Sequence, residues 1–326
     1  LTVDGLPEGL ALDSARGLIT GSVAEAGSYR MTFRAANAHG TAEREWRLEV
    51  GERIALTPPM GWNSWNCFAH TVSDANIRTA AQAMVESGLI RHGWSYVNID
   101  DYWQTSPGER TDTSLMGPAR DSAGRILPNA RFPDMAALCR DVHRLGLKIG
   151  IYSSPGSTTC GGCVGSWGHE AQDAQTYAEW GFDYLKYDWC SYAQRARDDS
   201  LSELMRPYRV MNRALRAQPR DLLFSLCQYG MGHVPAWGAR VGGQCWRTTH
   251  DIVDTWESVI GIVRAQEGFE LFAEPGAWND LDMLVVGTVG WGTPHPTRLT
   301  PNEQYSHISY WCLLASPLML GCHLTQ

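Results

Sequence analysis

The chain has 326 residues, of which 44% are hydrophobic and 19% are charged, and its formal net charge is −8 at pH 7. This composition predicts one large folded domain or two modest ones and argues against disorder. The acidic balance argues against a nucleic-acid partner, and the lack of any apolar run of ~20 residues argues against a membrane partner. The chain also has 14 tryptophans, whose broad faces suit flat, amphipathic ligands such as sugar rings.

Residues 1–52 have the pattern of β-structure. A short β-like run at 18–22 is followed by alternating polar and apolar residues at 29–36. Turn-forming residues come next at 37–40, and Trp46, Leu48 and Val50 then make an apolar face. Alternation with a period of two is typical of strands. Three or so short strands cannot close a sandwich, so we predict a partial β module that acts as a spacer.

From residue 53 onward, strand-like segments alternate with helical ones. The strand-like segments are apolar and lie at 61–65, 96–103, 147–153, 184–190, 222–227, 245–252, 278–286 and 318–323. Helical periodicity occurs between them at 73–87, 134–145, 170–180, 201–217, 255–266 and 301–315, with a weaker short segment at 234–239. This alternation over roughly 270 residues predicts a (β/α)8 TIM barrel. A doubly wound sheet is the alternative, but no glycine-rich fingerprint follows any strand.

Carboxylates and aromatic residues recur at the ends of the predicted strands. Because the reactive groups of such barrels lie where the strands end, we expect these side chains to share one pocket. They are Asp100, Asp101, Tyr152, Asp188, Gln228, Tyr229, Arg247, Asp251, Asp280 and Asp282.

Two of the carboxylates are suited to acid–base or nucleophilic chemistry. Lys186 and Asp188 lie two residues apart on a strand and so share a face. We expect Lys186 to lower the pKa of Asp188, which suits a nucleophile, although a structural ion pair is the alternative. Asp251 offers a general acid, and two carboxylates facing one sugar carbon are the minimum for glycoside hydrolysis. Their separation in sequence does not decide between retaining and inverting chemistry.

The nine cysteines are too few for a disulfide scaffold but enough for a few disulfides in an exported protein. We therefore expect a secreted or periplasmic location, with any signal peptide preceding Leu1. Cys160-Gly-Gly-Cys163 is similar to half of a zinc site, but zinc needs four ligands and only Cys190 and His169 lie near in sequence. We predict no metal. Motifs of metalloproteases, nucleotide-binding proteins and serine hydrolases are missing.

Five separated motifs make the sequence resemble glycoside hydrolase family 27, the α-galactosidase (melibiase) family. They are TPPMGWNSWN at 57–66, NIDD at 98–101, KYDWC at 186–190, CWRTT at 245–249 followed by Asp251-Ile252, and WNDLDM at 278–283. The first segment resembles the C-terminal half of the small immunoglobulin-like modules that precede many bacterial glycosidases. The resemblance implies a partial immunoglobulin-like module over 1–52 and a catalytic barrel over 53–326. It also implies that the last barrel helix and the family's C-terminal β domain are absent.

The resemblance assigns roles to individual residues. It makes Asp188 the nucleophile and Asp251 the acid/base of a retaining double displacement. Asp100 and Asp101 match the pair that binds the galactose 4- and 6-hydroxyls, and Trp65 matches the platform under the sugar ring. Further substrate-binding positions are Tyr152, Cys160, Lys186, Gln228, Arg247 and Asp282, and the implied disulfides are Cys160–Cys190 and Cys227–Cys245.

One departure concerns Gln228, which stands where many relatives have Glu. We expect it to make a weaker or different contact with the 2-hydroxyl. The function that the resemblance implies is that of an α-galactosidase without a cofactor, releasing terminal α-D-galactose from oligo- or polysaccharides. A β-L-arabinopyranosidase with the same mechanism and an inactive carbohydrate-binding fragment are the alternatives. The sequence leaves the oligomeric state open.

Overall fold

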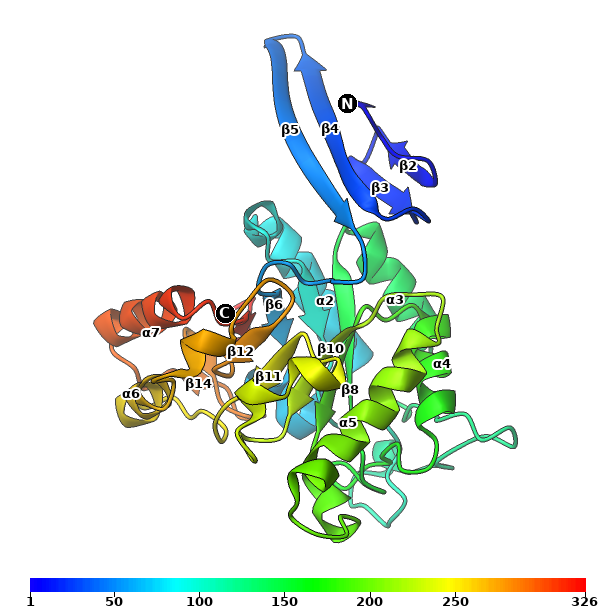
Figure 1. Cartoon of the computed structure of the whole chain (residues 1–326), viewed down its shortest axis with the longest axis vertical. Coiled ribbons are helices and arrows are strands. Elements are labelled where there is room, and N and C mark those ends of the chain that lie inside the picture. Colours follow the sequence, from blue (N-terminus) through cyan, green and yellow to red (C-terminus); the bar gives the residue numbers. More distant parts are fainter. The chain divides into compact units, whose positions relative to one another are not determined.

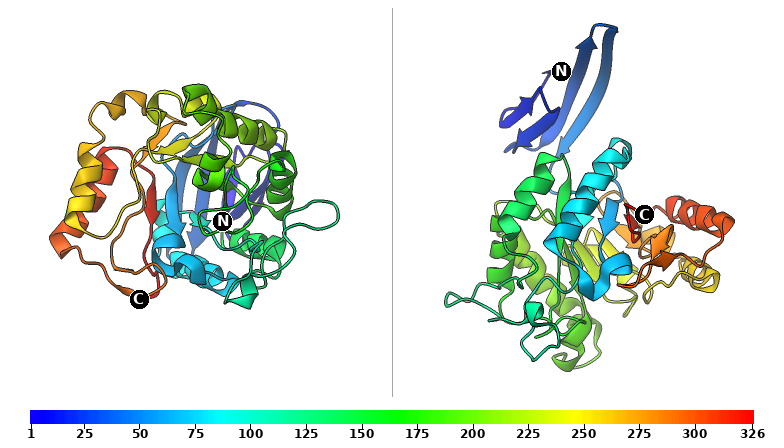
Figure 2. Two further views of the ribbon diagram at one scale, coloured as in Figure 1. Left: turned by 90° about the horizontal axis from the view of Figure 1, so that it is seen from below. Right: turned by 180° about the vertical axis from the view of Figure 1, so that it is seen from behind.

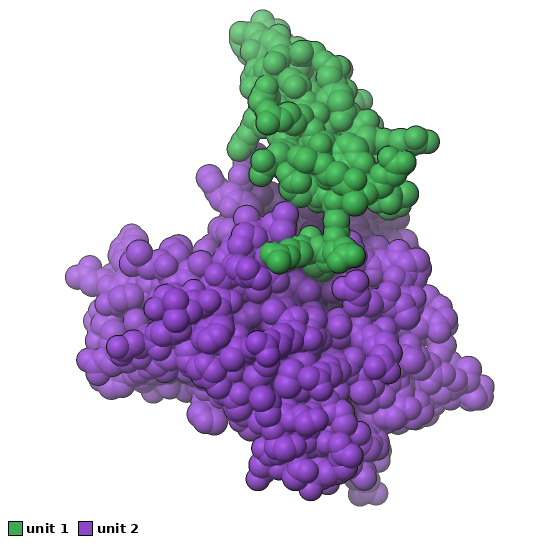
Figure 3. All heavy atoms as spheres, viewed as in Figure 1, with its two compact units in different colours: residues 1–54 green, residues 55–326 purple.

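The computed structural model describes residues 1–326 and separates them into two units, residues 1–54 and residues 55–326 (Figure 3). The first unit consists of antiparallel strands. Strands β1, β4 and β5 form one sheet, and β2 pairs with β3. The strands are β1 (Thr2–Asp4), β2 (Leu10–Asp13), β3 (Leu18–Gly21), β4 (Gly27–Asn37) and β5 (Gly40–Val50).

The β4–β5 hairpin dominates this unit and confirms the turn predicted at 37–40. Asn37 pairs with Gly40 across the turn, and the backbone N–H of His39 donates to Asn37 Oδ1 at 2.8 Å. Strands β1 and β2 were not predicted, because three or four residues are too few to show a period of two. Met31 is 1% exposed whereas Trp46 is 51% exposed, so the unit has a small core.

The second unit is built on a parallel sheet of eight strands, which confirms the predicted barrel class. The sheet order is β12-β11-β10-β9-β8-β7-β6-β15, so neighbours in sequence are neighbours in space, as in a (β/α)8 barrel. The strands are β6 (Met60–Asn63), β7 (Tyr96–Asn98), β8 (Lys148–Ser153), β9 (Tyr184–Asp188), β10 (Leu223–Cys227), β11 (Cys245–Arg247), β12 (Trp278–Asp280) and β15 (Leu318–Leu320).

The two edges of the sheet meet at one bridge beyond β12. Leu284 pairs with Leu320 in parallel, its N–H donates to Met319 O at 2.7 Å, and Gly321 N–H donates to Leu284 O at 3.0 Å. We call this contact between residue 284 and β15 the seam. A short hairpin of β13 (Thr288–Val289) and β14 (His295–Pro296) follows it. All five residues of β10 are buried, because a parallel sheet is covered on both faces.

The helices surround the sheet, and they include all six that the sequence predicts (Figures 1 and 2). Most begin at a Ser, Thr or Asp side chain that accepts a backbone N–H, such as Ser73 and Thr255. The β10–β11 connection has only 3-10 turns at Val234–Ala236 and Ala239–Val241. None of the helices is long and apolar enough to cross a membrane. The helices are α1 (Trp65–Phe68), α2 (Asp74–Glu86), α3 (Met135–Arg144), α4 (Glu170–Trp180), α5 (Leu201–Arg216), α6 (Trp256–Arg264) and α7 (Pro301–Leu313).

Candidate active site

A pocket of about 300 Å³ lies at the C-terminal ends of the barrel strands. It brings together both predicted catalytic residues and all but one of the predicted substrate-binding residues. It also includes Tyr229, which was expected at this strand end without a role, and Trp291, which the sequence did not single out. Asp280 was expected in the pocket but does not line it. Its lining consists of Trp65, Asn66, Asp100, Asp101, Tyr152, Cys160, Lys186, Asp188, Tyr229, Arg247, Asp251, Ile252, Val253, Asp282, Met283 and Trp291.

Asp188 is the last residue of β9 and is 5% exposed. Each of its carboxylate oxygens accepts a hydrogen bond from a tyrosine. Tyr229 Oη donates to Oδ1 at 2.7 Å, and Tyr152 Oη donates to Oδ2 at 3.1 Å. Burial raises the pKa of Asp188 above its ordinary value, although Lys186 and the Tyr229 hydroxyl act in the opposite direction. The expectation that Lys186 sets a lowered pKa was therefore wrong, because the cost of burying the charge is larger.

Lys186 forms its ion pair with Asp100 instead. Lys186 Nζ donates to Asp100 Oδ2 at 2.8 Å, and Asn63 Nδ2 donates to the same oxygen at 2.9 Å. Both members of the ion pair are nearly buried. Although burial opposes the charge of Lys186, Asp100 holds its pKa well above the ordinary value. The pair therefore places fixed positive and negative groups side by side, which suits the binding of hydroxyl groups.

Asp101 is held by the backbone of two loops. Its Oδ1 accepts the N–H of Tyr102 at 2.8 Å, and its Oδ2 accepts the N–H of Gly161 at 2.7 Å. Burial raises the pKa of Asp101 to about 7. A Cβ at Gly161 would lie 2.5 Å from the Tyr102 ring and 2.9 Å from Asp101 Oδ2. Only glycine therefore allows this loop to approach the carboxylate.

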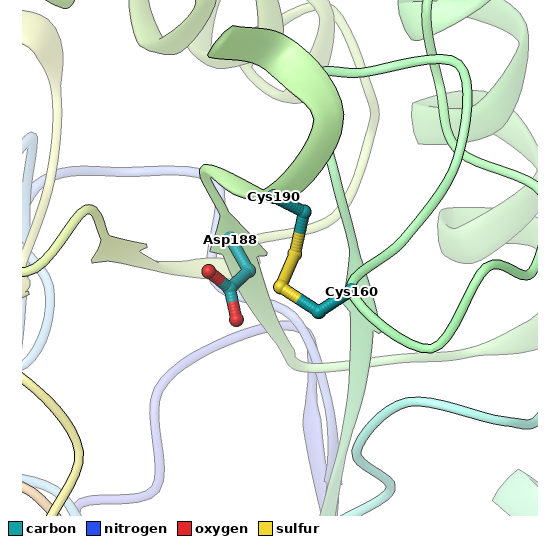
Figure 4. Close-up of side chains that lie close together, drawn as sticks. All are labelled: Cys160, Asp188 and Cys190. Atoms are coloured by element: carbon teal, nitrogen blue, oxygen red, sulfur yellow. A yellow bond between two sulfur atoms is a disulfide. The ribbon is translucent and has the colours of Figure 1, made fainter.

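A disulfide between Cys160 and Cys190 lies beside Asp188 (Figure 4). It links the loop after β8 to the residues that follow β9, across a sequence separation of 30 residues, and it confirms one of the two predicted pairings. Cys160, Cys190 and Asp188 have ligand atoms within 4.8 Å of one another. Because the two sulfur atoms are bonded to each other, they are not thiolates, and this cluster does not fit a metal site.

The second predicted disulfide was wrong, because Cys227 and Cys245 are buried free thiols. The sheet register pairs Cys245 with Ser225, and Cys227 with Asp188. Cys227 therefore lies two residues further along β10 than the partner of Cys245. With a rise of ~3.3 Å per residue and strands ~4.8 Å apart, the two Cα atoms are separated by about 8 Å, which is too far for a disulfide.

Asp251 follows β11 and has a side chain that is 64% exposed. Arg247 Nη2 lies 3.0 Å from Asp251 Oδ1 and 3.0 Å from Asp282 Oδ2, so one guanidinium bridges two carboxylates. The positive charge of Arg247, with a smaller contribution from Lys186, lowers the pKa of Asp251 below its ordinary value. Asp282 is 5% exposed and burial raises its pKa to about 6. The N–H of Ile252 fixes Asp282 through a hydrogen bond of 2.8 Å to Oδ2.

Aromatic rings form another part of the pocket. Trp65, the first residue of α1, lies at an angle of 18° to Tyr102, with the ring centroids 6.3 Å apart. The backbone N–H of Trp65 donates to Asn63 Oδ1 at 2.8 Å. The predicted platform residue is therefore in the pocket, with a second ring nearly parallel to it.

Gln228 does not line the pocket, contrary to the sequence prediction. Its side chain is fully buried and its Nε2 donates to Met231 O at 2.8 Å. The next residue, Tyr229, has a φ of +63° and lines the pocket in its place. In a regular strand Gln228 would point into the pocket. A positive φ at a tyrosine is uncommon, and no sequence pattern predicts it.

Comparison with known proteins assigns the chain to a family. The family described as "Alpha galactosidase A" (Melibiase_2) matches residues 57–326, and the family described as "Putative Ig domain" matches residues 1–51. The chain belongs to the melibiase family. Alpha-galactosidase 2 of Arabidopsis thaliana is 41% identical over 281 residues, which cover 85% of this chain and 64% of that protein. The chain thus spans less than two thirds of the length of this curated relative.

Solved structures agree with this assignment. A Bacteroides fragilis protein described as a "putative alpha-galactosidase/melibiase" superposes with a TM-score of 0.90 and 38% identity, covering 100% of this chain and 68% of that one. The α-galactosidase of Saccharomyces cerevisiae, solved with raffinose, has a TM-score of 0.72 and 30% identity, covering 82% of this chain and 60% of that one.

Proposed function

We propose that this melibiase is an α-galactosidase that releases terminal α-D-galactose from oligo- or polysaccharides with retention of configuration. The observation that carries the proposal is the pairing of a buried carboxylate, Asp188, with an exposed carboxylate, Asp251, in one pocket. Retaining glycosidases use two carboxylates in this way. The named relatives at 41% and 30% identity act as further support.

In the first step, Asp188 attacks the anomeric carbon and forms a glycosyl ester while Asp251 protonates the leaving oxygen. In the second step, Asp251 removes a proton from water, which attacks the ester and frees galactose and the Asp188 carboxylate. The two carboxylates repel each other electrostatically. Ester formation removes the charge of Asp188, so the pKa of Asp251 falls when it must act as a base.

We infer the preference for galactose from the wall that carries Asp100 and Asp101. Both are 1–2% exposed, and both are held by hydrogen bonds that fix their free lone pairs. A buried carboxylate rejects an epimer whose hydroxyl points elsewhere, because the carboxylate then remains unpaired. The axial 4-hydroxyl and the 6-hydroxyl of galactose are the groups we assign to this pair.

The disulfide supports a proposal about location. Disulfides persist in oxidising compartments, and the Cys160–Cys190 bond lies next to the assigned nucleophile. We infer that the protein works outside the cytoplasm, as a secreted or periplasmic enzyme.

The test is a comparison of kcat/KM for nitrophenyl α-D-galactopyranoside and nitrophenyl β-L-arabinopyranoside, with raffinose as the oligosaccharide substrate. We expect the galactoside to be preferred and NMR of the product to show the α-anomer first. Preference for the arabinoside would replace the assigned sugar, and the β-anomer as first product would overturn retention. Binding without turnover would indicate a carbohydrate-binding protein instead.

A further inference from the structure

Tyr229 touches the assigned nucleophile, although the roles given above leave it without a function. Its hydroxyl donates to Asp188 Oδ1 at 2.7 Å, a shorter bond than the 3.1 Å bond from Tyr152 to Oδ2. Tyr229 also lines the pocket, while its neighbour Gln228 is turned away from it. The two tyrosines come from different parts of the chain and hold opposite oxygens of one carboxylate.

The backbone of Tyr229 adopts a conformation that aims its ring at Asp188. Its φ of +63° is unusual for a residue with a side chain, and Gly230 follows at +84°. A Cβ at Gly230 would lie 2.2 Å from Thr248 O, so the segment after β10 packs tightly against the segment after β11. A left-handed backbone is unfavourable for a residue with a side chain, so the surrounding packing must hold Tyr229 in this conformation.

Two neighbours fix the ring. The His250 ring is nearly parallel to it at 17°, with centroids 6.0 Å apart, and the Arg247 guanidinium lies 5.9 Å from the ring centroid. Tyr229 therefore connects the assigned nucleophile with Arg247, which pairs with the assigned acid/base Asp251. The hydroxyl donates to Asp188 Oδ1 at 2.7 Å, and Cys160 Sγ lies 3.7 Å from the hydroxyl oxygen.

We propose that Tyr229 is a positioning residue of the reaction, whose hydroxyl holds Asp188 in one orientation and stabilises it as a carboxylate. This inference rests on the proposed function. When Asp188 leaves the anomeric carbon in the second step, negative charge returns to its carboxylate, and a fixed O–H donor stabilises that charge. In the first step the same hydrogen bond favours the ionised nucleophile. Loss of the hydroxyl therefore slows the second step more than the first.

The direct test is a titration of Asp188 by NMR with aspartate labelled at the side-chain carboxyl carbon, using Asp188→Asn to assign its signal. The variants are Tyr229→Phe, which removes only the hydroxyl, and the wild-type chain with 3-fluorotyrosine at 229, whose more acidic hydroxyl donates more strongly. We expect the pKa of Asp188 to rise by about one unit in Tyr229→Phe and to fall with fluorotyrosine. Tyr305→Phe, at a tyrosine that is 75% exposed on α7, is the matched control without a shift.

Kinetics give the second readout. The acidic limb of the kcat/KM profile of Tyr229→Phe should move to higher pH by a similar amount. Its kcat should fall about tenfold, with a larger pre-steady-state burst on dinitrophenyl α-galactoside because the glycosyl ester accumulates. In Tyr229→Leu the acidic limb of the kcat/KM profile should move as it does in Tyr229→Phe. The KM should also rise, since this variant removes the ring from the pocket.

The two proposals fail in different ways. If the wild-type chain cleaves no α-galactoside, the proposed function is wrong, and the NMR titration still decides whether Tyr229 stabilises the carboxylate. If the wild-type chain is active but neither variant shifts the Asp188 titration, the role of Tyr229 is wrong. If Tyr229→Phe fails to fold, the fluorotyrosine protein alone decides, and an unchanged titration there overturns the inference.

Discussion

The carboxylates on the two sides of the pocket differ in how far they are exposed to solvent. On one side, which we call the closed wall, Asp100, Asp101 and Asp188 lie beside Lys186 and the Cys160–Cys190 disulfide, and Asp188 is 5% exposed. On the other side, which we call the open wall, Arg247 bridges Asp251 and Asp282, and the Asp251 side chain is 64% exposed. The difference matches the proposed roles, because a nucleophile needs a fixed position while an acid/base must exchange protons with water.

The largest effect expected on the closed wall is that of Asp188→Asn. The amide keeps the volume and most hydrogen bonds but cannot form the ester, so kcat/KM for α-galactosides should fall by about 10⁴-fold or more, the scale for loss of a nucleophile. Asp198→Asn, at an exposed carboxylate, is the control. Equal turnover of the Asp188 variant and the wild-type chain would show that the nucleophile lies elsewhere.

On the open wall, Asp251→Asn should have an effect that depends on the leaving group. General acid catalysis contributes about 10²–10⁴-fold, so cleavage of raffinose should fall by that factor. Cleavage of dinitrophenyl α-galactoside should fall far less in the first step, since this leaving group needs no proton. A uniform loss with both substrates would contradict the assignment of Asp251 as the acid.

The closed wall should also lower stability at high pH. Burial raises the pKa of Asp101 from 3.8 to about 7, so the folded state holds a proton that the unfolded state has lost. The resulting stability is present below pH ~4 and is lost as pH rises through 7, up to about 4 kcal/mol. Asp101→Asn loses one of the two backbone hydrogen bonds at every pH, but it does not titrate. Its unfolding temperature relative to the wild-type chain should therefore rise between pH 4 and pH 8. It should also lose galactoside turnover.

Thermal unfolding measured by calorimetry from pH 4 to 8 checks this prediction. Asp183→Asn provides the contrast of sign, because the pKa of Asp183 is lowered by His143 and Arg220 despite its burial. That variant should be destabilised at neutral pH. Parallel pH profiles for the wild-type chain and Asp101→Asn would contradict the raised pKa.

The smallest effect should come from the disulfide that supports the closed wall. Replacing both Cys160 and Cys190 with Ser should reduce the free energy of unfolding by about 3–4 kcal/mol, from the entropy of a loop whose ends are 30 positions apart in the sequence. Activity should fall only severalfold, because the tyrosines still hold Asp188. Denaturant unfolding measures the first effect, with Cys312→Ser, an exposed free cysteine, as control. Unchanged stability would show that the bond does not brace this wall.

Sequence patterns predicted most of the barrel and the closed wall. Helix starts such as Ser73 and Thr255 have capping side chains, and strands such as β10 are apolar throughout, so local signals agree with the fold. Asp100 and Asp101 lie just after β7, and Asp188 is the last residue of β9, so the strand pattern places all three at the same end of the barrel. Each of these features depends on a short stretch of sequence, so it can be predicted without knowledge of the folded structure.

The missed features depend on geometry that a linear pattern does not contain. Gln228 was expected in the pocket together with Tyr229, but the positive φ of Tyr229 leaves only the tyrosine there. The absence of a Cys227–Cys245 bond follows from the register of β10 and β11. The raised pKa of Asp188 depends on burial by residues far away in sequence. Each is set by packing between segments that come together only in the folded chain.

The seam has a consequence for local opening of the barrel. Neighbouring strands of the sheet share registers of two to five residue pairs, whereas the seam is a single pair, Leu284–Leu320. The amide protons of Leu284 and Gly321 make its two hydrogen bonds, and few bonds need to break to release them. Among the amides of the sheet, these two should therefore exchange with deuterium first, and the amides of β9 and β10 should exchange last. The strand that carries Asp188 would thus stay protected while the barrel opens at the opposite side.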